Sequence, residues 1–496
     1  MPQPPTNGPA AQRPWLIQGG MGVGVSGWRL AKAVSREGQL GVVSGTALDV
    51  VLARVLQTGD PGGHARRALA AFPLPELAQT ALDCYFRADG PGEGVPMRTT
   101  PRLRATGGVP AEILTVLGNF VEVWLAKEEP GGTSRTKSGG GVVGINYLEK
   151  IQLATAPAMF GAILAGVDYV LVGAGVPGQI PALASRLARC EPCVTKIAVE
   201  GDETPLDHLF DPAALLAGHL PGPLRRPDVL AIVSLPVLAA YLARDEATRP
   251  DGFVIETSQA GGHSAPPRGP MKLDEQGEPV YGPRDHPDLA RMAALGLPFW
   301  LAGGQASPEA VAAARAEGAA GVQVGSAFAL CEESGMAPHL RAELRGRSLA
   351  GTLTVRNDPD ASPTSFPFKV AELPGTVSEP EVAAARRRVC DLGFLRTPVR
   401  GPRGLVYRCA AEPVAAYVRK GGDPADAKGR QCLCNGLLAT IGLAQRRPGG
   451  RVEPPLVTIG KDLSFLPELS PAAEPYAAAD VVNWLAAGVV SPAGRP

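Results

Sequence analysis

Short apolar runs that end in small residues alternate with stretches whose apolar residues recur at helical spacing. Trp15-Leu-Ile-Gln-Gly-Gly20 has the pattern of a buried strand that leads into a loop, and Gly41-Val-Val-Ser-Gly45 is a second such run. Between them, residues 26–37 have apolar positions at helical spacing, with Ser26 as the expected N-cap and Gly38 as the stop. The chain therefore begins strand–helix–strand.

This alternation resumes after residue 141 and continues to about residue 325. Helical stretches such as 235–244 and 308–317 separate most of the later strand-like runs. Repeated strand–helix units with glycine at the ends of strands predict a parallel α/β fold. The later strand-like runs are 142–148, 169–173, 194–199, 229–234, 252–256, 299–302 and 322–325.

The strand count favours a barrel. Nine candidates are one more than a TIM barrel requires. We assign the run 194–199 to an excursion, because residues 200–227 after it are long and rich in proline. The prediction is a TIM (β/α)8 barrel, with a doubly wound sheet as the structural alternative.

Two regions depart from the alternation. Residues from about 60 to 141 are rich in Pro, Gly and Arg, with a helical stretch near 111–128 and a mobile, loop-like end at 131–141, which predicts an insertion after the second strand. After residue 346 the strand–helix units stop, so we expect an extension that packs on the barrel and is not a second catalytic domain. The expected organisation is a flexible N-terminal arm (1–14), a barrel (15–345) and a Cys-containing C-terminal extension (346–496).

Composition and charge narrow the functional classes. The 496 residues include 48 Lys and Arg and 48 Asp and Glu, and this balance argues against nucleic-acid binding, which needs a basic face. The N-terminus lacks the apolar core of a signal peptide. The nearest candidate for a membrane span, residues 154–176, contains Asp168 and several glycines. We therefore expect a cytoplasmic protein with no membrane partner, whose eight cysteines are reduced.

The strongest candidate chemistry lies in two successive loops that carry glycines. Leu301-Ala-Gly-Gly-Gln305 is followed, one helix later, by Gly321-Val-Gln-Val-Gly-Ser-Ala-Phe328. Their backbone N–H groups can surround a phosphate, and the loops after the last two strands of a barrel commonly do so. Tight turns alone are the structural alternative. Because neither Gly20–Gly24 nor Gly173–Gly175 completes a dinucleotide fingerprint, a mononucleotide such as FMN fits better.

A histidine follows the glycine pair Gly261-Gly262. Glycines let the backbone approach a flat ligand, and His263 at the mouth of a barrel can take a proton from carbon or bind an anionic substrate oxygen. The structural alternative is a loop histidine that is hydrogen-bonded to backbone. The other histidines lie in Pro/Gly-rich loops or beside charges and are expected to be solvated: His64, His208, His219, His286 and His339.

These motifs resemble those of the nitronate monooxygenases, formerly called 2-nitropropane dioxygenases, and of the related FMN-dependent enoyl reductases. The resemblance spans residues 15–330 in the family's order. Its segments are Ile17-Gln-Gly-Gly-Met-Gly22, Gly41-Val-Val-Ser-Gly45, Val143-Gly-Ile-Asn-Tyr147, Gly173-Ala-Gly175, Ala260-Gly-Gly-His263, Ala302-Gly-Gly304 and Gly321-Val-Gln-Val-Gly-Ser326.

The resemblance implies a TIM barrel that binds FMN without a covalent link. It places the loop Gly20-Met21-Gly22 beside the flavin ring and Asn146 in contact with the flavin. It makes His263 the catalytic histidine, which binds the nitro group or removes the α-proton of a nitroalkane. The further cofactor-binding positions it implies are Gly173, Gly261, Gly262, Gly303, Gly304, Gln323, Gly325 and Ser326.

The activity that the resemblance implies is the oxidation of nitronates or nitroalkanes with oxygen. An FMN-dependent enoyl-thioester reductase of fatty-acid or polyketide synthesis, with NAD(P)H as redox partner, fits the barrel motifs equally well. The third hypothesis is a protein that binds a phosphate-bearing ligand without redox chemistry, or a partner subunit. The basic residue that some family members carry before the histidine loop is replaced by Ser234-Leu-Pro-Val, and Lys196 is the nearest substitute. The substrate pocket is therefore not transferable, and the sequence indicates neither substrate nor oligomeric state.

Four cysteines gather in the extension: Cys390, Cys409, Cys432 and Cys434. Four thiolates can bind zinc or an iron–sulfur cluster. The gaps of 18 and 22 residues and the Cys-Leu-Cys pair are not standard metal-ligand spacings. We therefore predict reduced thiols and no metal, with a metal as the alternative. Cys190-Glu-Pro-Cys193 has no second pair nearby and is interpreted as structural.

Overall fold

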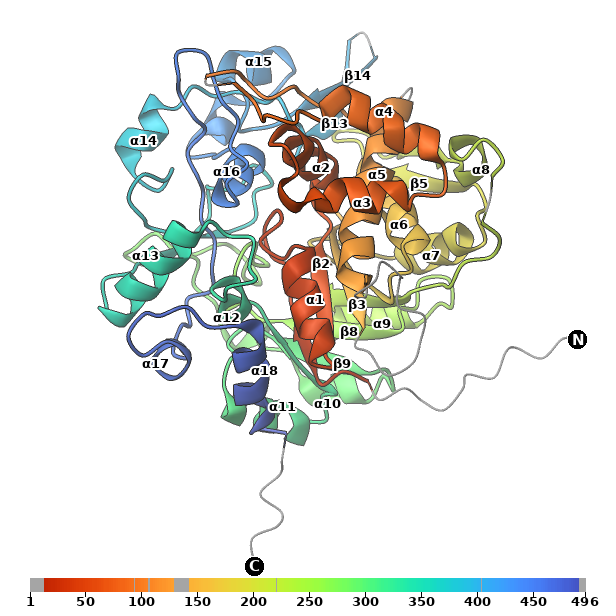
Figure 1. Cartoon of the computed structure of the whole chain (residues 1–496). Helices are drawn as coiled ribbons and strands as arrows, with labels where there is room; N and C mark the ends of the chain where they lie inside the picture. The colour runs from red at the N-terminus through yellow and green to blue at the C-terminus, as the bar shows by residue number, and fades with distance from the viewer. Residues whose placement is uncertain are drawn as a thin grey trace, which may run out of the picture.

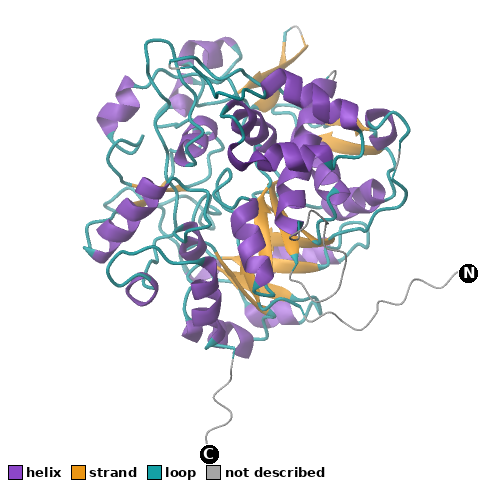
Figure 2. Ribbon diagram, in the orientation of Figure 1, coloured by secondary structure: helices purple, strands orange, loops and turns teal. Residues whose placement is uncertain are grey.

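Eight parallel strands close into a barrel that is surrounded by helices (Figures 1 and 2). The computed structural model describes residues 13–489 except 93, 106–107, 129–141, 220 and 403. Around the barrel the strands are β1 (Leu16–Gln18), β10 (Gly321–Val324), β9 (Phe299–Ala302), β8 (Gly252–Glu256), β7 (Asp228–Val233), β4 (Tyr169–Gly173), β3 (Val143–Leu148) and β2 (Leu40–Ser44). Because β1 pairs with both β10 and β2, the predicted TIM barrel is confirmed and the doubly wound sheet is wrong.

Large apolar side chains fill the inside of the barrel. Ile17 on β1 lies opposite Gln323 on β10 and opposite Leu40 on β2. This register places residues of adjacent strands at the same height along the barrel. Trp300 on β9 is fully buried, and its indole Nε1 donates to the carbonyl oxygen of Pro14 at 2.8 Å. This packed interior leaves the carboxyl ends of the strands as the place for a site. The interior cluster comprises Ile17, Leu40, Val42, Leu171, Leu230, Val254, Trp300 and Ala302.

The ninth strand candidate lies outside the barrel, as predicted. Strand β5 (Cys193–Ile197) pairs antiparallel with β6 (Leu206–Phe210), whereas all barrel pairs are parallel. Lys196 is on an exposed face of this hairpin, and its Nζ lies 2.6 Å from Asp207. It does not line the cavity described below, so Lys196 as a substitute for the family's basic residue is wrong.

The helices that cover the barrel come from distant parts of the chain. Helix α5 packs against α1 and α6, so it takes the place of the helix that normally follows β2. Helix α18, from the end of the chain, packs against α1 and α11 (Figure 1). The helices around the barrel are α1 (Trp28–Arg36), α2 (Leu48–Gln57), α3 (His64–Ala70), α4 (Pro75–Tyr85), α5 (Val109–Lys127), α6 (Gln152–Leu164), α7 (Ile180–Ala188), α8 (Pro212–Leu215), α9 (Pro236–Ala243), α10 (Leu289–Ala293), α11 (Pro308–Ala316), α12 (Ser326–Ala329) and α13 (Pro338–Leu349). Residues 60–128 thus contain the helices α3, α4 and α5, and α5 is the expected helix near 111–128.

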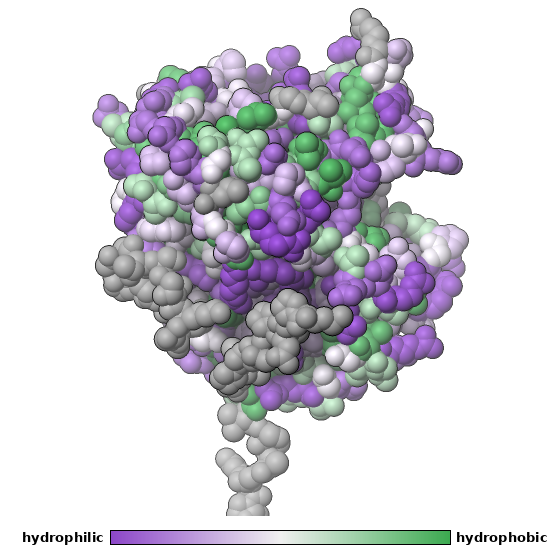
Figure 3. Space-filling view, turned by 90° about the vertical axis from the view of Figure 1, so that its right-hand side faces the viewer, coloured by the Kyte–Doolittle hydropathy of each residue, from purple (hydrophilic) through white to green (hydrophobic). Residues whose placement is uncertain are grey.

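Helix α5 is the described helix that is long and apolar enough to cross a membrane. The expectation that residues 154–176 come closest to a span is therefore wrong, because the helix there, α6, has only 13 residues. Of the apolar window in α5, 72% is buried, and Gly161 on α6 lies so close that a Cβ there would be 2.2 Å from the carbonyl oxygen of Val116. Such close packing is typical of a core helix. Figure 3 shows one face of the molecule, where hydrophobic residues occur in small groups among hydrophilic ones.

The C-terminal extension covers the carboxyl ends of the barrel strands. Gly262 is held from both sides, since its N–H donates to Thr458 Oγ1 at 3.0 Å and its carbonyl accepts from Lys369 N at 2.9 Å. The extension contains β11 (Val355–Asp358), β12 (Phe368–Ala371), β13 (Thr397–Gly401), β14 (Gly404–Arg408), α14 (Pro380–Ala385), α15 (Val414–Arg419), α16 (Leu433–Thr440), α17 (Leu466–Leu469) and α18 (Ala478–Ala486). The expected loop 131–141 and most of the expected arm lie outside the described residues.

Candidate active site

A cavity of about 480 Å³ opens at the carboxyl ends of the barrel strands. Its volume is in the usual range for pockets that bind small molecules and cofactors. All the residues that the sequence singled out for cofactor or catalysis line this one cavity, although their individual roles stay predictions. They are Gly20, Met21, Gly22, Asn146, Gly173, Gly261, Gly262, His263, Gly303, Gly304, Gln323, Gly325 and Ser326.

The glycines bring bare backbone to the cavity wall at positions where a side chain would collide. Gly303 has a φ of +90°, and a Cβ there would lie 2.4 Å from Thr257 Oγ1. A Cβ on Gly261 would lie 2.9 Å from the backbone nitrogen of Gly460, which belongs to the extension. The backbone conformation at Gly303 and the close approach at Gly261 both require glycine.

The loop after β1 is held by Ser26, which the sequence analysis expected to be a helix N-cap. Ser26 Oγ accepts from Met21 N at 3.0 Å and donates to the carbonyl oxygen of Gly19 at 2.9 Å. The N-cap of α1 is instead Gly27, which makes no side-chain capping bond, so the expectation for Ser26 is wrong. The hydroxyl is used to fix the turn that carries Met21 into the cavity.

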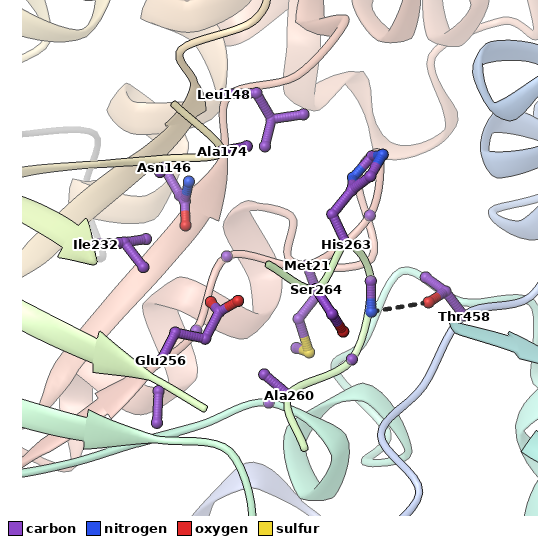
Figure 4. Close-up of a pocket in the computed structure, with 18 of the residues that line it drawn as sticks. Met21, Asn146, Leu148, Ala174, Ile232, Glu256, Ala260, His263, Ser264 and Thr458 are labelled. Atoms are coloured by element: carbon purple, nitrogen blue, oxygen red, sulfur yellow. Dashed lines mark hydrogen bonds between the residues drawn. The ribbon is translucent and has the colours of Figure 1, made fainter. Parts of the chain in front are cut away.

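One polar atom at the cavity lacks a partner. Gln323 Oε1 is buried and accepts no hydrogen bond from the described residues. A buried, unsatisfied oxygen costs free energy unless a ligand or water supplies a donor. Asn146 faces the same space from β3, with Glu256 on β8 and Ile232 on β7 beside it (Figure 4). This part of the cavity is therefore shaped for a ligand with hydrogen-bond donors.

His263 lies across the cavity from this group and is anchored by the extension. Its Nε2 is 2.7 Å from Ser362 Oγ and 3.3 Å from Thr364 Oγ1, and its ring contacts the edge of Phe368 at a centroid distance of 4.8 Å. Burial and then the charge of Lys150 lower the pKa of His263 to about 3. The imidazole is therefore neutral at physiological pH, and no described residue bonds to its Nδ1.

Two ionisable groups escaped the sequence analysis: Glu256, which lines the cavity, and Lys369, which contacts the lining residue Ser264. Burial raises the pKa of Glu256 to about 7, with Lys369 acting in the opposite direction. Lys369 comes from β12 and is 1% exposed; its Nζ donates to Ser258 O at 2.6 Å and to Ser264 Oγ at 2.7 Å. A polar residue that ends a buried barrel strand is a signal that could have identified Glu256. No local pattern marks Lys369, because it reaches the site only through the folded extension.

Apolar residues of the extension form the other wall of the cavity. They share a position above the barrel mouth and include aromatic rings, which sequence reasoning did not connect with the site. These residues are Phe366, Phe368, Phe394, Leu395, Leu433 and Leu437. The extension therefore decides the shape of this side of the cavity.

Other residues that the sequence raised are elsewhere. His208 is 2% exposed, and its Nε2 lies 3.2 Å from Glu112 Oε1, so its expected solvation is wrong. Cys390, Cys409, Cys432 and Cys434 line one small hollow in the extension. Across the described ranges, no group of three or more His, Cys, Asp or Glu side chains is arranged to hold a metal ion.

One of the comparisons with known proteins covers part of the site. The family model for nitronate monooxygenase matches residues 224–359, which include β7 to β10, His263 and the two predicted phosphate loops. No protein of the curated set matches. Among solved structures, FabK from Thermotoga maritima has a TM-score of 0.46 and 15% identity, covering 96% of this chain and 92% of that one. Nitroalkane oxidase from Streptomyces ansochromogenes has a TM-score of 0.43 and 16% identity, covering 96% and 95%.

The barrel, its cavity and the family match define the class: this protein is an enzyme, a flavin-dependent oxidoreductase built on a TIM barrel. Within that class, residues 224–359 match the family model for nitronate monooxygenase, which confirms the resemblance over this part of the chain. The residues present fit a flavin, since bare backbone lines the wall and the orphaned oxygen of Gln323 can accept from a ligand N–H.

Proposed function

We propose that this enzyme uses FMN and oxidises nitronates, or the nitroalkanes from which they form, with oxygen. The loops at Gly303-Gly304 and Gly325-Ser326 would hold the phosphate, and Met21 and Asn146 would lie against the ring system. The bound cofactor would accept electrons from the substrate. A single phosphate is favoured because the chain lacks a complete dinucleotide fingerprint.

The observation that carries this proposal is the neutral, anchored His263 at the cavity wall. A base whose pKa is about 3 is unprotonated at neutral pH, but it gains little by taking a proton from carbon. A nitronate has already lost its α-proton and needs no such step. We therefore assign His263 to substrate binding through Nδ1, held in place by Ser362 and Thr364. The preferred substrate is then the nitronate anion and not the neutral nitroalkane.

Two measurements test the proposal. The visible spectrum of the purified protein, before and after denaturation, should show a flavin that is released as FMN. Oxygen consumption should be faster with a pre-formed alkyl nitronate than with the same nitroalkane at equal concentration. His263→Asn should keep the yellow colour and lose most of the turnover. A colourless protein that does not take up added FMN would refute the cofactor, and equal rates with both substrate forms would refute the binding role of His263.

The apolar wall favours one alternative substrate. Phe366, Phe368, Phe394 and Leu433 offer a surface that an acyl chain could cover, as an enoyl-thioester reductase requires. NAD(P)H oxidation that depends on an enoyl thioester, measured without oxygen, would select this reductase. Nitronate-dependent oxygen consumption without NAD(P)H would select the oxidase.

A further inference from the structure

Four thiols of the extension meet at one hollow, and two of them are in contact. The hollow has a volume of about 10 Å³ and is lined by Cys390, Cys409, Cys432 and Cys434, all of them free thiols. The thiol of Cys409 donates a hydrogen bond to the sulfur of Cys390. Cys390 follows α14, Cys409 follows β14 and Cys434 is on α16, so only the folded extension brings these thiols together.

The two thiols in contact differ in acidity. The hydrogen bond from Cys409 lowers the pKa of Cys390, burial acts in the opposite direction, and the charges of Arg396 and Arg102 lower it further. The same contact and burial raise the pKa of Cys409. Because the thiolate is the nucleophile, Cys390 is the attacking thiol of the pair. Cys390 is also partly exposed, so a small oxidant can reach it, whereas Cys409 is 8% exposed.

The hollow also contains an acceptor without a partner. Asn435 lines it and is 0% exposed. Its Nδ2 donates to Asp391 Oδ1 at 2.8 Å and to Cys432 Sγ at 3.6 Å, but its Oδ1 accepts no hydrogen bond from the described residues. A hydroxyl group in the hollow, such as that of a peroxide or of a cysteine sulfenic acid, would supply the missing donor. The volume is about that needed for one water-sized group.

The thiol pair lies at the base of a loop that forms part of the main cavity wall. This loop, residues 391–396, is called the wall loop below. Its Phe394 and Leu395 line the main cavity, and Leu395 also lines the thiol hollow. The loop ends where Thr397 on β13 pairs with Arg408 on β14, directly before Cys409. A bond between Cys390 and Cys409 would therefore fix the wall loop at both of its ends.

We propose that Cys390 and Cys409 form an oxidisable thiol pair, which hydrogen peroxide converts into a disulfide that fixes the wall loop. The pair is a modification site in the extension. It goes beyond the proposed function, because its chemistry needs neither flavin nor substrate. An acidic, accessible thiol beside a second thiol is the arrangement typical of redox-sensitive cysteines.

The oxidation takes two steps. The thiolate of Cys390 attacks one oxygen of hydrogen peroxide; an S–O bond forms, the O–O bond breaks, and the leaving hydroxide takes a proton and becomes water. The sulfur of Cys409 then attacks that of Cys390 as its own proton leaves; the S–S bond forms, the S–O bond breaks, and a second water is released. Two thiols are thus oxidised and one peroxide is reduced. A dithiol reductant reverses the change by exchange.

Peptide mapping of the wild-type protein tests the pair. The native, reduced protein is treated with hydrogen peroxide, blocked with an alkylating reagent, denatured and digested with trypsin without reductant. Trypsin places Cys390 in the peptide 389–396 and Cys409 in 409–419, whereas Cys432 and Cys434 share the peptide 431–446. We expect the first two peptides to be linked, and free thiols to fall from eight to six per chain. The absence of this link, or a link from Cys390 to the peptide 431–446, would overturn the proposal.

Two variants identify the attacking thiol. Cys409→Ser should stop at the sulfenic acid of Cys390, which dimedone traps on the peptide 389–396. The matched control is Cys84→Ser, because Cys84 is also partly exposed but does not line the hollow; it should form the link as the wild type does. Dimedone on the peptide 409–419 of Cys390→Ser, with none on 389–396 of Cys409→Ser, would contradict the assignment of Cys390.

Hydrogen exchange tests the effect on the wall loop. Amides of residues 391–396 should exchange more slowly in the oxidised protein than in the reduced one, and dithiothreitol should restore the faster rate. Helix α11 on the barrel is the internal control and should not change. Equal exchange of the wall loop in both forms would overturn its fixation by the disulfide. None of these measurements uses flavin or turnover, so their failure and the failure of the proposed function are distinguishable.

Discussion

Replacing His263 with asparagine removes a titrating group whose protonation the fold opposes. The pKa of this histidine is 6.5 in the unfolded chain and about 3 in the folded one, because burial and Lys150 disfavour the imidazolium. Below pH 6.5 the unfolded chain therefore binds a proton that the folded chain refuses. The free energy of unfolding is unaffected by this site above pH 6.5 and falls progressively as the pH decreases towards 3.

The size of the effect follows from these two pKa values. Between pH 7 and pH 5, the site lowers the free energy of unfolding of the wild type by about 2 kcal/mol. His263→Asn lacks this contribution. The variant also loses the contacts of the ring with Ser362 and Phe368, but that loss is the same at both pH values. The wild type should therefore lose about 2 kcal/mol more than the variant over this pH range.

Urea unfolding at pH 7, 6 and 5, followed by tryptophan fluorescence, measures the difference. The five tryptophans of the chain provide the signal, and the comparison of two proteins cancels the titration of all other groups. A difference between wild type and variant that does not change with pH would refute the reasoning. In that case His263 would be accessible to protons in the folded state, and it would regain the role of a base.

Three further predictions concern the cavity. Glu256→Gln should raise the free energy of unfolding at pH 8 by about 1–3 kcal/mol and leave it nearly unchanged at pH 5. The reason is that a carboxyl group whose pKa is raised to about 7 by burial opposes folding only when it is ionised. Urea unfolding at both pH values measures this difference. Gly303→Ala should lose flavin, measured by absorption after gel filtration, and about 1–3 kcal/mol of stability, whereas Gly296→Ala, which has a positive φ but open space, should keep its flavin. Lys369→Met should destabilise the fold by about 2–4 kcal/mol in thermal unfolding, because Ser258 O and Ser264 Oγ lose a charged donor. The control Lys428→Met should have no such effect, because Lys428 is exposed. Equal effects of the two variants would contradict a stabilising role for the buried Lys369 ammonium.

The extension changes what the barrel can do. It covers the barrel mouth with Phe366 and Phe368 and fixes His263 through Ser362. It also delivers Lys369 to within hydrogen-bond distance of Ser264. A barrel without this extension would expose the same glycine loops, but His263 would lack its anchor. The shape of the cavity is therefore a property of residues 346–496 as much as of the barrel.

The barrel and its glycine loops could be predicted because their causes are local. Apolar runs of four to six residues that end in glycine are buried parallel strands with bare carboxyl ends, and closing them into a ring brings those ends together. Gly303, with its φ of +90°, is required by its own turn. For this reason all the predicted site residues line one cavity. Ser26 shows the limit of local rules, because its hydroxyl has two possible uses and the turn at Met21 decided between them.

What only the tertiary structure decided is which charges meet at the site. The pairing of Lys369 with the loop after β8 joins positions 369 and 264, and the contact of His263 with Ser362 spans a similar distance along the chain. No periodicity encodes contacts between such distant residues, because they depend on how the extension folds back over the barrel. The sequence by itself determined a flavin barrel with a histidine at its mouth. The fold determined that this histidine is neutral and that Glu256 faces it across the cavity with a raised pKa, because burial, which shifts each pKa, exists only in the folded chain.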